Sequence, residues 1–488
     1  MTKIIPKQPA IVFRNRLLKP STKKAEPKEI DTKFIRNCAF NNERGDADLF
    51  VAIARGEFVY DDDEKKWYRH DKGVWREVKC EMVTIYQDLT FQAYKGLENI
   101  LDNGNIKKTY RRIQNLRTSK AGLELARGLL MARAVDFDKV DTEINLTNGV
   151  FDFKSRTFRV HQPTDRFKIQ LLYDYNPDAD CPNFNAFLKR IFDSDTDLIE
   201  WLQHRIGISL TGLIPYEEFL FGYGTGANGK SVLVGILQML LGEYCRNISA
   251  DLLLTKQQSN EDERTKTRFF RARLIIANEV GQHKRIDEAM VKSLTGGKSD
   301  KIIARRLFNE QFEFIPTHKL WFFGNYKPNI SGTDEAIKRR LKTLPFSVTI
   351  PKEERTDKEQ LFAMFMAEIA GIFNWACEGY YKRPKEPESV REATDLYFAE
   401  CDSLGQFLEE QTTKEPESRE RLKAIFERFK QWCIDSGNRQ IHKTDRELKK
   451  AILEKSIHEK LGYEEGKASG GGVIIKGLKI ITNQTEAL

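Results

Sequence analysis

FLFGYGTGANGKSVLVGILQMLLG, residues 219–242, joins an apolar run, a glycine-rich turn and a segment whose apolar residues recur at helical spacing. This order predicts a strand, a loop and a helix. Within it, Gly224, Gly229, Lys230 and Ser231 have the spacing G-x-x-x-x-G-K-[ST] of a phosphate-binding loop. Glycines let the backbone curl so that its N–H groups and the helix N-terminus face a polyphosphate. The stretch therefore predicts an α/β fold that binds ATP.

The polar residues of this loop match the chemistry of MgATP. We expect Lys230 to reach the β- and γ-phosphates and the Ser231 hydroxyl to ligate Mg²⁺. The predicted nucleotide-binding residues are Gly224, Gly226, Asn228, Gly229, Lys230 and Ser231.

The composition indicates a soluble protein of two to four domains. The chain has 488 residues with 31 Phe, 15 Tyr and 6 Trp, which suffices for a substantial core. No apolar run approaches the roughly 20 residues that span a bilayer. The seven cysteines lie far apart, without a C-x-x-C pair or a zinc-ligand cluster. We therefore expect reduced thiols, no structural metal, no membrane contact and a cytoplasmic location, in a host cell if the chain is viral.

Much of the net charge of +8 lies at the N-terminus. Residues 1–30 hold eight basic side chains and only two acidic ones, a local charge of +6. Their prolines and lack of periodicity predict a disordered tail over residues 1–35. The tail either keeps the protein soluble or contacts nucleic acid, and both interpretations remain open.

Residues 36–144 are expected to form an α+β module that ends in basic helices. The four basic residues Lys107, Lys108, Arg111 and Arg112 could contact a phosphate backbone, although a solvated helix face is the favoured interpretation. The predicted elements are a helix at 46–55, strands at 57–60, 66–69 and 74–78, an acidic turn at 61–63, and helices at 82–101 and 106–131.

Downstream of the phosphate loop, two strands end in polar residues. The first, at 273–277, is followed by Asn278 and Glu279. Glu279 is expected to orient or deprotonate the attacking water. An acid is usual at the position of Asn278, so its role as a Mg²⁺ ligand is in doubt, and the ion would rely on Ser231 and water. The second strand, at 319–323, leads to Asn325, whose amide is suited to a sensor of the γ-phosphate.

Two arginines follow, on a charged helix predicted at 334–340. Arg339 or Arg340 could stabilise charge in the phosphoryl-transfer transition state of a neighbouring subunit, which would require an oligomer. A surface or salt-bridge role for either arginine remains open.

Between the two strands lies a basic segment. A helix is expected to stop at Gly296, and the residues that follow predict a basic hairpin, because cations surround a β-branched pair. In the pore of a ring, such a hairpin would track a single strand through phosphate contacts. The candidate DNA-binding residues are Lys298, Lys301, Arg305 and Arg306.

Five ordered motifs together resemble the superfamily 3 helicase core, an AAA+ ATPase, of poxvirus-type primase-helicases from phages, plasmids and satellite elements. They are GTGANGKS, the Asn-Glu strand tip, KSLTGGKSDKIIARRL, FIPTHKLWFFGNYKP and TDEAIKRRLKTLPF. The resemblance covers about residues 140–488. It implies a hexameric ring that hydrolyses ATP between subunits and translocates on DNA, usually 3′ to 5′. Many relatives carry a primase domain before this core. About 140 residues are too few for it, so we expect no primer synthesis.

The C-terminal part, 386–488, predicts helices followed by a glycine-tipped strand pair, as in a winged helix. Its second long helix carries the basic residues Lys443, Arg446, Lys449 and Lys450, which serve either DNA binding or a protein contact. The expected divisions are the tail at 1–35, the α+β module at 36–144, a β meander and helical collar at 145–212, the ATPase core at 213–350, a helical linker at 351–385 and the winged helix at 386–488.

Two functional classes remain open. The favoured one is a DNA helicase acting in replication of a phage, plasmid or other mobile element. Its partners would be single-stranded and forked DNA, copies of the same chain, and a separate primase or polymerase. The alternative is an initiator or loader that assembles on an origin with ATP and does not unwind processively. A regulatory ATPase outside replication is a weaker third class.

Overall fold

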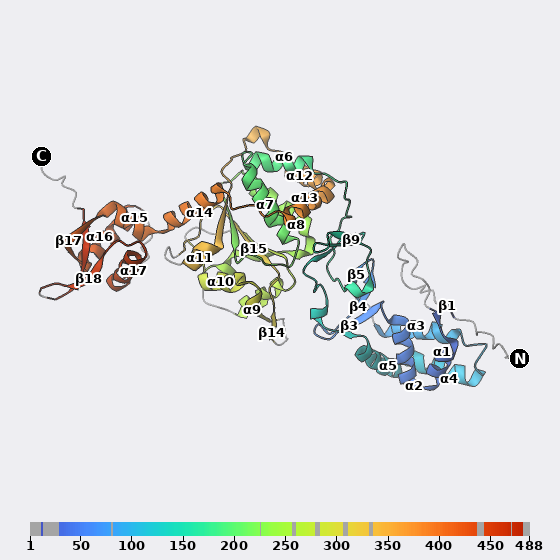
Figure 1. Cartoon of the computed structure of the whole chain (residues 1–488). Coiled ribbons are helices and arrows are strands. Elements are labelled where there is room, and N and C mark those ends of the chain that lie inside the picture. Colours follow the sequence, from blue (N-terminus) through green and yellow to red (C-terminus); the bar gives the residue numbers. More distant parts are fainter. Residues whose placement is uncertain are drawn as a thin grey trace.

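Three units follow one another in the computed structural model of the chain (Figure 1). The structure describes residues 11–12, 29–79, 82–224, 226–255, 260–278, 284–305, 311–330, 335–436, 444–469 and 471–481. Glu279 and Arg306 lie outside these residues, as does most of the basic tail. Within residues 1–35 the structure describes the paired strands β1 (Ile11–Val12) and β2 (Glu29–Ile30) and the chain from Asp31 onward. The prediction of disorder up to residue 35 is wrong at its end, because a helix capped by Asp31 begins at Thr32.

The central unit is built on a five-stranded parallel sheet. Its strands have the order β11-β12-β15-β10-β16. Apolar side chains from alternate positions enter two separate hydrophobic clusters, one on each face, as expected for a parallel sheet covered on both sides. The strands are β10 (Phe219–Tyr223), β11 (Cys245–Ser249), β12 (Leu274–Asn278), β15 (Lys319–Gly324) and β16 (Leu341–Pro345).

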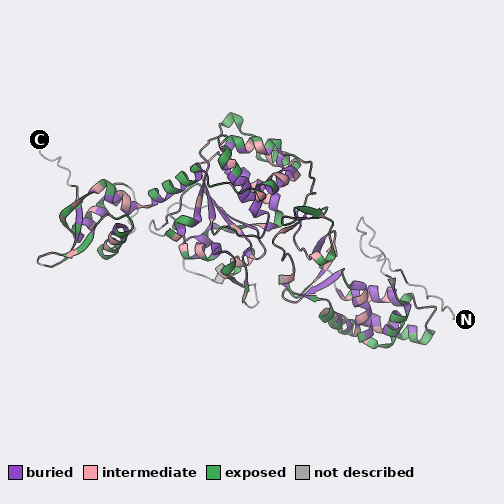
Figure 2. Cartoon of the chain, in the orientation of Figure 1, coloured by how far each residue is buried: buried purple, intermediate pink, exposed green. Residues whose placement is uncertain are grey.

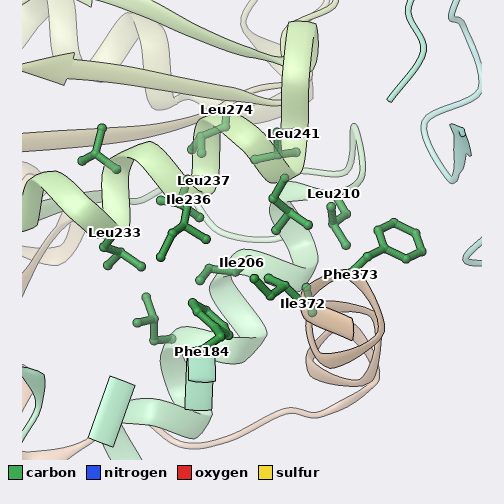
Figure 3. Packing of buried hydrophobic residues seen from close by; sticks show 14 of the residues in the cluster. Phe184, Ile206, Leu210, Leu233, Ile236, Leu237, Leu241, Leu274, Ile372 and Phe373 are labelled. Atoms are coloured by element: carbon green, nitrogen blue, oxygen red, sulfur yellow. The ribbon is translucent and has the colours of Figure 1, made fainter. Parts of the chain in front are cut away.

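One face of the sheet carries a layer of helices. The helix α8 (Lys230–Leu241) follows the phosphate loop and packs with α7 (Thr196–Ser209) and α13 (Ile369–Tyr381), as Figure 3 shows for Leu237, Ile206 and Phe373. A Cβ at Gly207 would lie 2.4 Å from the Ala376 carbonyl oxygen, so glycine lets α7 approach α13 closely. The helices that precede the phosphate loop in the sequence therefore share one hydrophobic core with α8 and the central sheet. The layer also includes α6 (Pro182–Ile191) and α12 (Lys358–Ala367).

The other face is covered by shorter helices and by α14 (Glu388–Cys401), which leads to the C-terminal unit. Figure 2 shows the buried residues concentrated in the sheet and its neighbouring helices. No helix of the described ranges has both the length and the apolar character of a membrane span; α12 and α13 reach that length only together, across a bend of 69°. The shorter helices are α9 (Asn260–Lys266), α10 (Glu288–Thr295) and α11 (Glu335–Arg340).

The N-terminal unit combines a helical bundle with a small sheet of order β5-β4-β3-β6. The single helix predicted at 106–131 is wrong, because the chain breaks at Asn115. Asn115 has extended backbone angles, and its side chain caps the second helix by accepting from the Arg117 N–H. The elements are α1 (Thr32–Phe40), α2 (Asn42–Ala54), β3 (Phe58–Asp61), β4 (Lys66–Asp71), β5 (Val74–Glu77), α3 (Met82–Lys95), α4 (Asn103–Gln114), α5 (Leu116–Leu129) and β6 (Met131–Ala132).

A three-stranded meander joins this unit to the central sheet. It comprises β7 (Glu143–Asn145), β8 (Val150–Asp152) and β9 (Thr157–Arg159). Residues 160–175 add no further strand to this sheet. Instead the Asn145 side chain donates to the carbonyls of Gly73 and Ile169, so single hydrogen bonds hold the later residues in place.

The C-terminal unit has its own hydrophobic core and an antiparallel sheet of order β17-β19-β18. The sequence did not indicate β17, because its residues, TTKEPESRER, are almost all polar and mostly exposed. The elements are α15 (Ser403–Gln411), β17 (Thr412–Arg421), α16 (Leu422–Asp435), α17 (Asp445–His458), β18 (Glu464–Lys467) and β19 (Val473–Ile480).

Candidate nucleotide site and basic hairpin

The phosphate loop lies between β10 and α8, at the carboxyl edge of the sheet. Gly226 and Gly229 have φ angles of +117° and +83°, which glycine adopts without strain. Gly224 has no room for a side chain, since a Cβ would lie 2.1 Å from Nδ2 of Asn228. Asn228 is buried, and its amide donates to the Phe346 carbonyl at 3.4 Å. The chain after β16 therefore holds the loop in shape.

The Lys230 ammonium is the electrostatic centre of the site. Nζ donates to the Gly224 carbonyl and, at 3.0 Å, to Oδ1 of Asn325. Burial lowers the pKa of Lys230. Both acceptors are neutral, so the buried cation has no carboxylate beside it among the described residues. A polyphosphate at the N-terminus of α8 would supply the missing negative charge.

Parallel pairing brings the predicted polar residues to the same edge of the sheet. Tyr223 of β10 pairs with Gly324 of β15, and Asn278 of β12 pairs with Phe323. Asn278 and Asn325 therefore follow adjacent strands beside the phosphate loop. In open α/β sheets, ligands bind at this carboxyl edge. The Ser231 side chain is exposed in the first turn of α8, where a metal-bound phosphate would lie.

The two candidate arginines lie at the opposite edge. They end α11, and the following residue, Leu341, pairs with Phe219 at the start of β10, about 13 Å along the strand from its tip. Arg340 is buried and pairs with Glu217, with Nη2 2.8 Å from Oε2. Arg339 is exposed. Neither residue faces the phosphate loop of its own chain.

The predicted basic hairpin is present, formed by β13 (Ile302–Arg305) and β14 (Gln311–Phe314). Ile302 and Ala304 face the core, whereas Arg305 is exposed. Lys301 is also exposed and lies 3.2 Å from a carboxylate oxygen of Glu313 on the paired strand. The hairpin therefore presents cations on its solvent side.

Lys298 is not on this hairpin, contrary to the prediction. It lies in a 3₁₀ turn at Gly297–Ser299, and its Nζ is 2.9 Å from Oδ2 of Asp141, which precedes the meander. The pattern of cations along the chain did not distinguish the two positions, because the partner is 157 residues away.

Lys298 belongs to a polar junction between the meander and the base of the sheet. Arg273 donates to the carbonyls of Leu210 and Glu143, and Lys319 donates to that of Leu213 at 3.1 Å. Burial raises the pKa of Asp138 to about 6. These contacts fix the collar region to the ATPase sheet.

The sequence analysis assigned no role to Lys327, two residues after Asn325. Its Nζ lies 4.7 Å from the centre of the Tyr223 ring and 2.5 Å from a carboxylate oxygen of Glu400 on α14. Tyr397, also on α14, donates to the Pro328 carbonyl. α14 thus holds the loop that carries Asn325. No local signal could have shown this contact, because its partners are 73 and 69 residues apart.

Within the described ranges, no group of three or more His, Cys, Asp or Glu side chains forms a metal site. Among the described residues at the phosphate loop and the tip of β12, the oxygen donors for Mg²⁺ are the Ser231 hydroxyl and the neutral Asn278 side chain. This set suits an ion held mainly by phosphate oxygens and water.

Comparison with known proteins first identifies the class. A family model described as "D5 N terminal like" matches residues 47–193, and one described as "Family of unknown function (DUF5906)" matches residues 222–340. The first match begins well upstream of residue 140, where the resemblance was expected to start. The region that is similar to known proteins therefore includes much of the N-terminal helical unit.

The particular relatives are viral. The chain is 31% identical over 229 residues to "Putative helicase L207/L206" of Acanthamoeba polyphaga mimivirus, covering 46% of this chain and 24% of that protein. It is 24% identical over 225 residues to "Putative helicase V13" of Sputnik virophage, covering 43% and 28%. The chain thus spans about a quarter of the length of these relatives. It is related to viral proteins named as putative helicases.

A solved structure, "The A form apo structure of NrS-1 C terminal region-CTR", aligns over 88% of this chain and 98% of that one, with 10% identity and a TM-score of 0.49. A similarity at this level supports no further conclusion.

Proposed function

We propose that the chain is an ATP-dependent DNA helicase with an AAA+ core of superfamily 3. It forms a ring, most simply a hexamer, and translocates 3′ to 5′ on single-stranded DNA. The observation that carries the proposal is the contact of Lys230 with Asn325, which joins the phosphate loop to a polar strand tip on a parallel sheet. The kinship with viral proteins named as putative helicases supports the same class.

In this proposal each polar group at the carboxyl edge has one task. Lys230 leaves its neutral acceptors and neutralises the β- and γ-phosphates. Asn325 then hydrogen-bonds the γ-phosphate and the attacking water, and Glu279 orients or deprotonates that water. Mg²⁺, when bound beside Ser231, neutralises charge on the phosphate oxygens.

An arginine from a neighbouring subunit completes the proposed site. Arg339 is the better candidate, because its side chain is exposed whereas Arg340 is committed to Glu217. Its position at the edge opposite to its own phosphate loop favours action in trans.

The proposed DNA contacts of the motor lie on the hairpin. Lys301 and Arg305 face solvent. Arg306, the next residue in the sequence, lies outside the described residues and stays a candidate from the sequence. The C-terminal unit has the element order helix, strand, helix, helix, strand, strand, which is that of a winged helix. On α17, Lys449 and Lys450 have carboxylate partners, Glu465 and Glu454, so Arg446 is the stronger candidate there for a contact with duplex DNA.

The biological role that we propose is replication of a virus, phage, plasmid or other mobile element, in the host cytoplasm, together with a separate primase or polymerase. The alternative function is an ATP-regulated initiator or loader that binds an origin and does not unwind processively.

A strand-displacement assay decides between them. Duplexes that carry a single-stranded tail at only a 3′ end or only a 5′ end are incubated with ATP and Mg²⁺. The wild-type chain is compared with Lys230→Ala. ATP-dependent displacement from the 3′-tailed substrate that is lost in the variant supports the helicase. ATP-dependent binding without displacement from either substrate identifies the initiator or loader. Absence of ATP hydrolysis and of DNA binding rejects both.

A further inference from the structure

The helices α4 and α5 of the N-terminal unit contain an uninterrupted basic stretch. Residues 103–123 include no aspartate or glutamate and six basic residues. One of the six, Arg112, turns into the unit, where Nε lies 2.7 Å from Oδ2 of Asp46 and Nη2 donates to the Ala39 carbonyl. Arg112 therefore has a structural role. It is no longer a candidate for contact with a phosphate backbone, unlike Lys107, Lys108 and Arg111.

The other five differ from Arg112 in every respect. All are exposed, and none has a carboxylate at ion-pair distance in the part of the chain that the structure describes. By contrast Arg127, near the end of α5, pairs with Glu124. The five residues, which we call the α4–α5 basic face, are Lys107, Lys108, Arg111, Arg117 and Lys120.

Helix electrostatics sets this face apart from an ordinary solvated surface. The first turn of α5 contains Arg117 and no acidic residue, although the N-terminus of a helix disfavours cations. Lys120 adds a second cation three residues later. Arg111 lies in the last turn of α4, where the helix dipole favours a cation. Like charges held together at a positive helix end are unfavourable unless an anion neutralises them. The opposite side of α4 supplies the rigidity, because Ile106 and Ile113 are buried in the core of the unit.

The location separates this face from the proposed motor contacts. Figure 1 shows α4 and α5 at the outer part of the N-terminal unit, away from β14 of the hairpin and from the C-terminal unit. A polyanion bound there would not occupy the pore.

We propose that the α4–α5 basic face binds the phosphate backbone of nucleic acid, as a contact separate from the hairpin. The proposal rests on the proposed function in one respect, the identity of the polyanion. A helicase binds DNA, so DNA is the expected polyanion. Lysine and arginine contacts to phosphate carry no sequence information, so the face would hold DNA of any sequence. This surface would tether the chain to its track while the hairpin releases and rebinds.

Equilibrium binding without ATP tests the proposal on the full chain. Fluorescent duplex and single-stranded oligonucleotides are titrated at several salt concentrations with the wild type, with Arg117→Gln/Lys120→Gln, and with a variant carrying glutamine at all five positions. We expect the double variant to bind at least about tenfold more weakly at low salt. Its slope of log affinity against log salt should fall by about 0.9 per lost contact on duplex, or about 0.7 on a single strand. The two slopes identify which form of DNA the face holds.

Lys352→Gln/Lys358→Gln is the matched control, with the same change in charge at exposed positions among acidic neighbours. An equal loss of affinity in this control, or wild-type affinity and slope in the five-position variant, overturns the proposal. Because the substituted side chains are exposed, circular dichroism should show unchanged folding, and the double variant suffices if the larger one does not fold. ATP hydrolysis without DNA reports on the proposed function separately, since the phosphate loop is untouched.

Discussion

The Lys230 ammonium lies between two neutral oxygens, so under the proposed function the phosphates of ATP would replace weak acceptors with strong ones. Lys230→Ala should reduce ATP hydrolysis by at least about 100-fold, the usual cost of removing one preorganised donor to developing charge. Asn325→Ala should keep nucleotide binding and lower turnover. Phosphate release and binding of a fluorescent ATP analogue measure the two effects. Wild-type turnover in either variant would contradict the assigned roles.

Substitutions of Arg339 and of Arg340 are expected to affect different properties of the protein. Arg340→Ala should lower the free energy of unfolding by about 2 kcal/mol, because it removes the buried guanidinium together with its charged hydrogen bond to Glu217. Arg339→Ala should leave stability unchanged and reduce hydrolysis by about 10³-fold or more. Mixing Arg339→Ala with Lys230→Ala should restore part of the activity, since some interfaces then hold both intact partners. No recovery in mixed oligomers confirmed by mass measurement would exclude action in trans.

Asp138 predicts a pH effect that is independent of ATP. Its pKa is raised from 3.8 to about 6 by burial, so between these values the folded chain binds more protons than the unfolded chain. The contribution of Asp138 is therefore fully present below pH 4 and is lost as the pH rises through 6. Calorimetry should show Asp138→Asn gaining stability relative to wild type over this interval, by up to about 3 kcal/mol. A constant difference between pH 4 and 7 would contradict the raised pKa.

At the scale of elements, the β13–β14 hairpin should couple hydrolysis to DNA movement. Lys301→Ala/Arg305→Ala should weaken single-stranded DNA binding and eliminate strand displacement, whereas hydrolysis without DNA should survive because the phosphate loop is remote from both residues. Lys298→Ala should instead lower thermal stability through the lost contact with Asp141. Displacement at the wild-type rate by the hairpin variant, with loss of displacement on deleting residues 1–28, would assign the DNA contact to the tail.

For the whole molecule, α14 belongs energetically to the central unit although it leads to the C-terminal one. Its Thr394 accepts from the Thr343 N–H of β16 at 2.9 Å, and Glu400 holds Lys327 beside the nucleotide site. A chain that ends after residue 402 should keep ATP hydrolysis within about twofold and bind duplex DNA more weakly, since only the contacts of the C-terminal unit are lost. A chain that ends after residue 387 lacks α14 as well. It should lose ATP hydrolysis and have a lower thermal stability. Equal behaviour of the two chains would show that α14 has no such role.

The elements that follow from local pattern were predicted well. The strand, loop and helix around Lys230 were identified because glycine spacing and apolar periodicity are properties of a few neighbouring residues. The first strand of the hairpin, at 302–305, lies within the basic segment predicted at 298–306, whereas its partner at 311–314 was not predicted. The break at Asn115 was missed, since a single capping side chain outweighed a helical pattern on both sides. The polar strand β17 was missed because its partner, β19, lies some 60 residues further along the chain.

The sequence by itself determined which residues can bind a phosphate, end a strand or carry positive charge, because those properties belong to the residue and its immediate neighbours. Only the tertiary structure decided which basic side chains are exposed and which are held by a carboxylate. Arg112 is held by Asp46, Lys298 by Asp141 and Arg340 by Glu217, across separations of 66, 157 and 123 residues. Such pairings depend on where the packed cores place the backbone. For this reason similar basic residues are held by carboxylates in one place and are exposed to solvent in another.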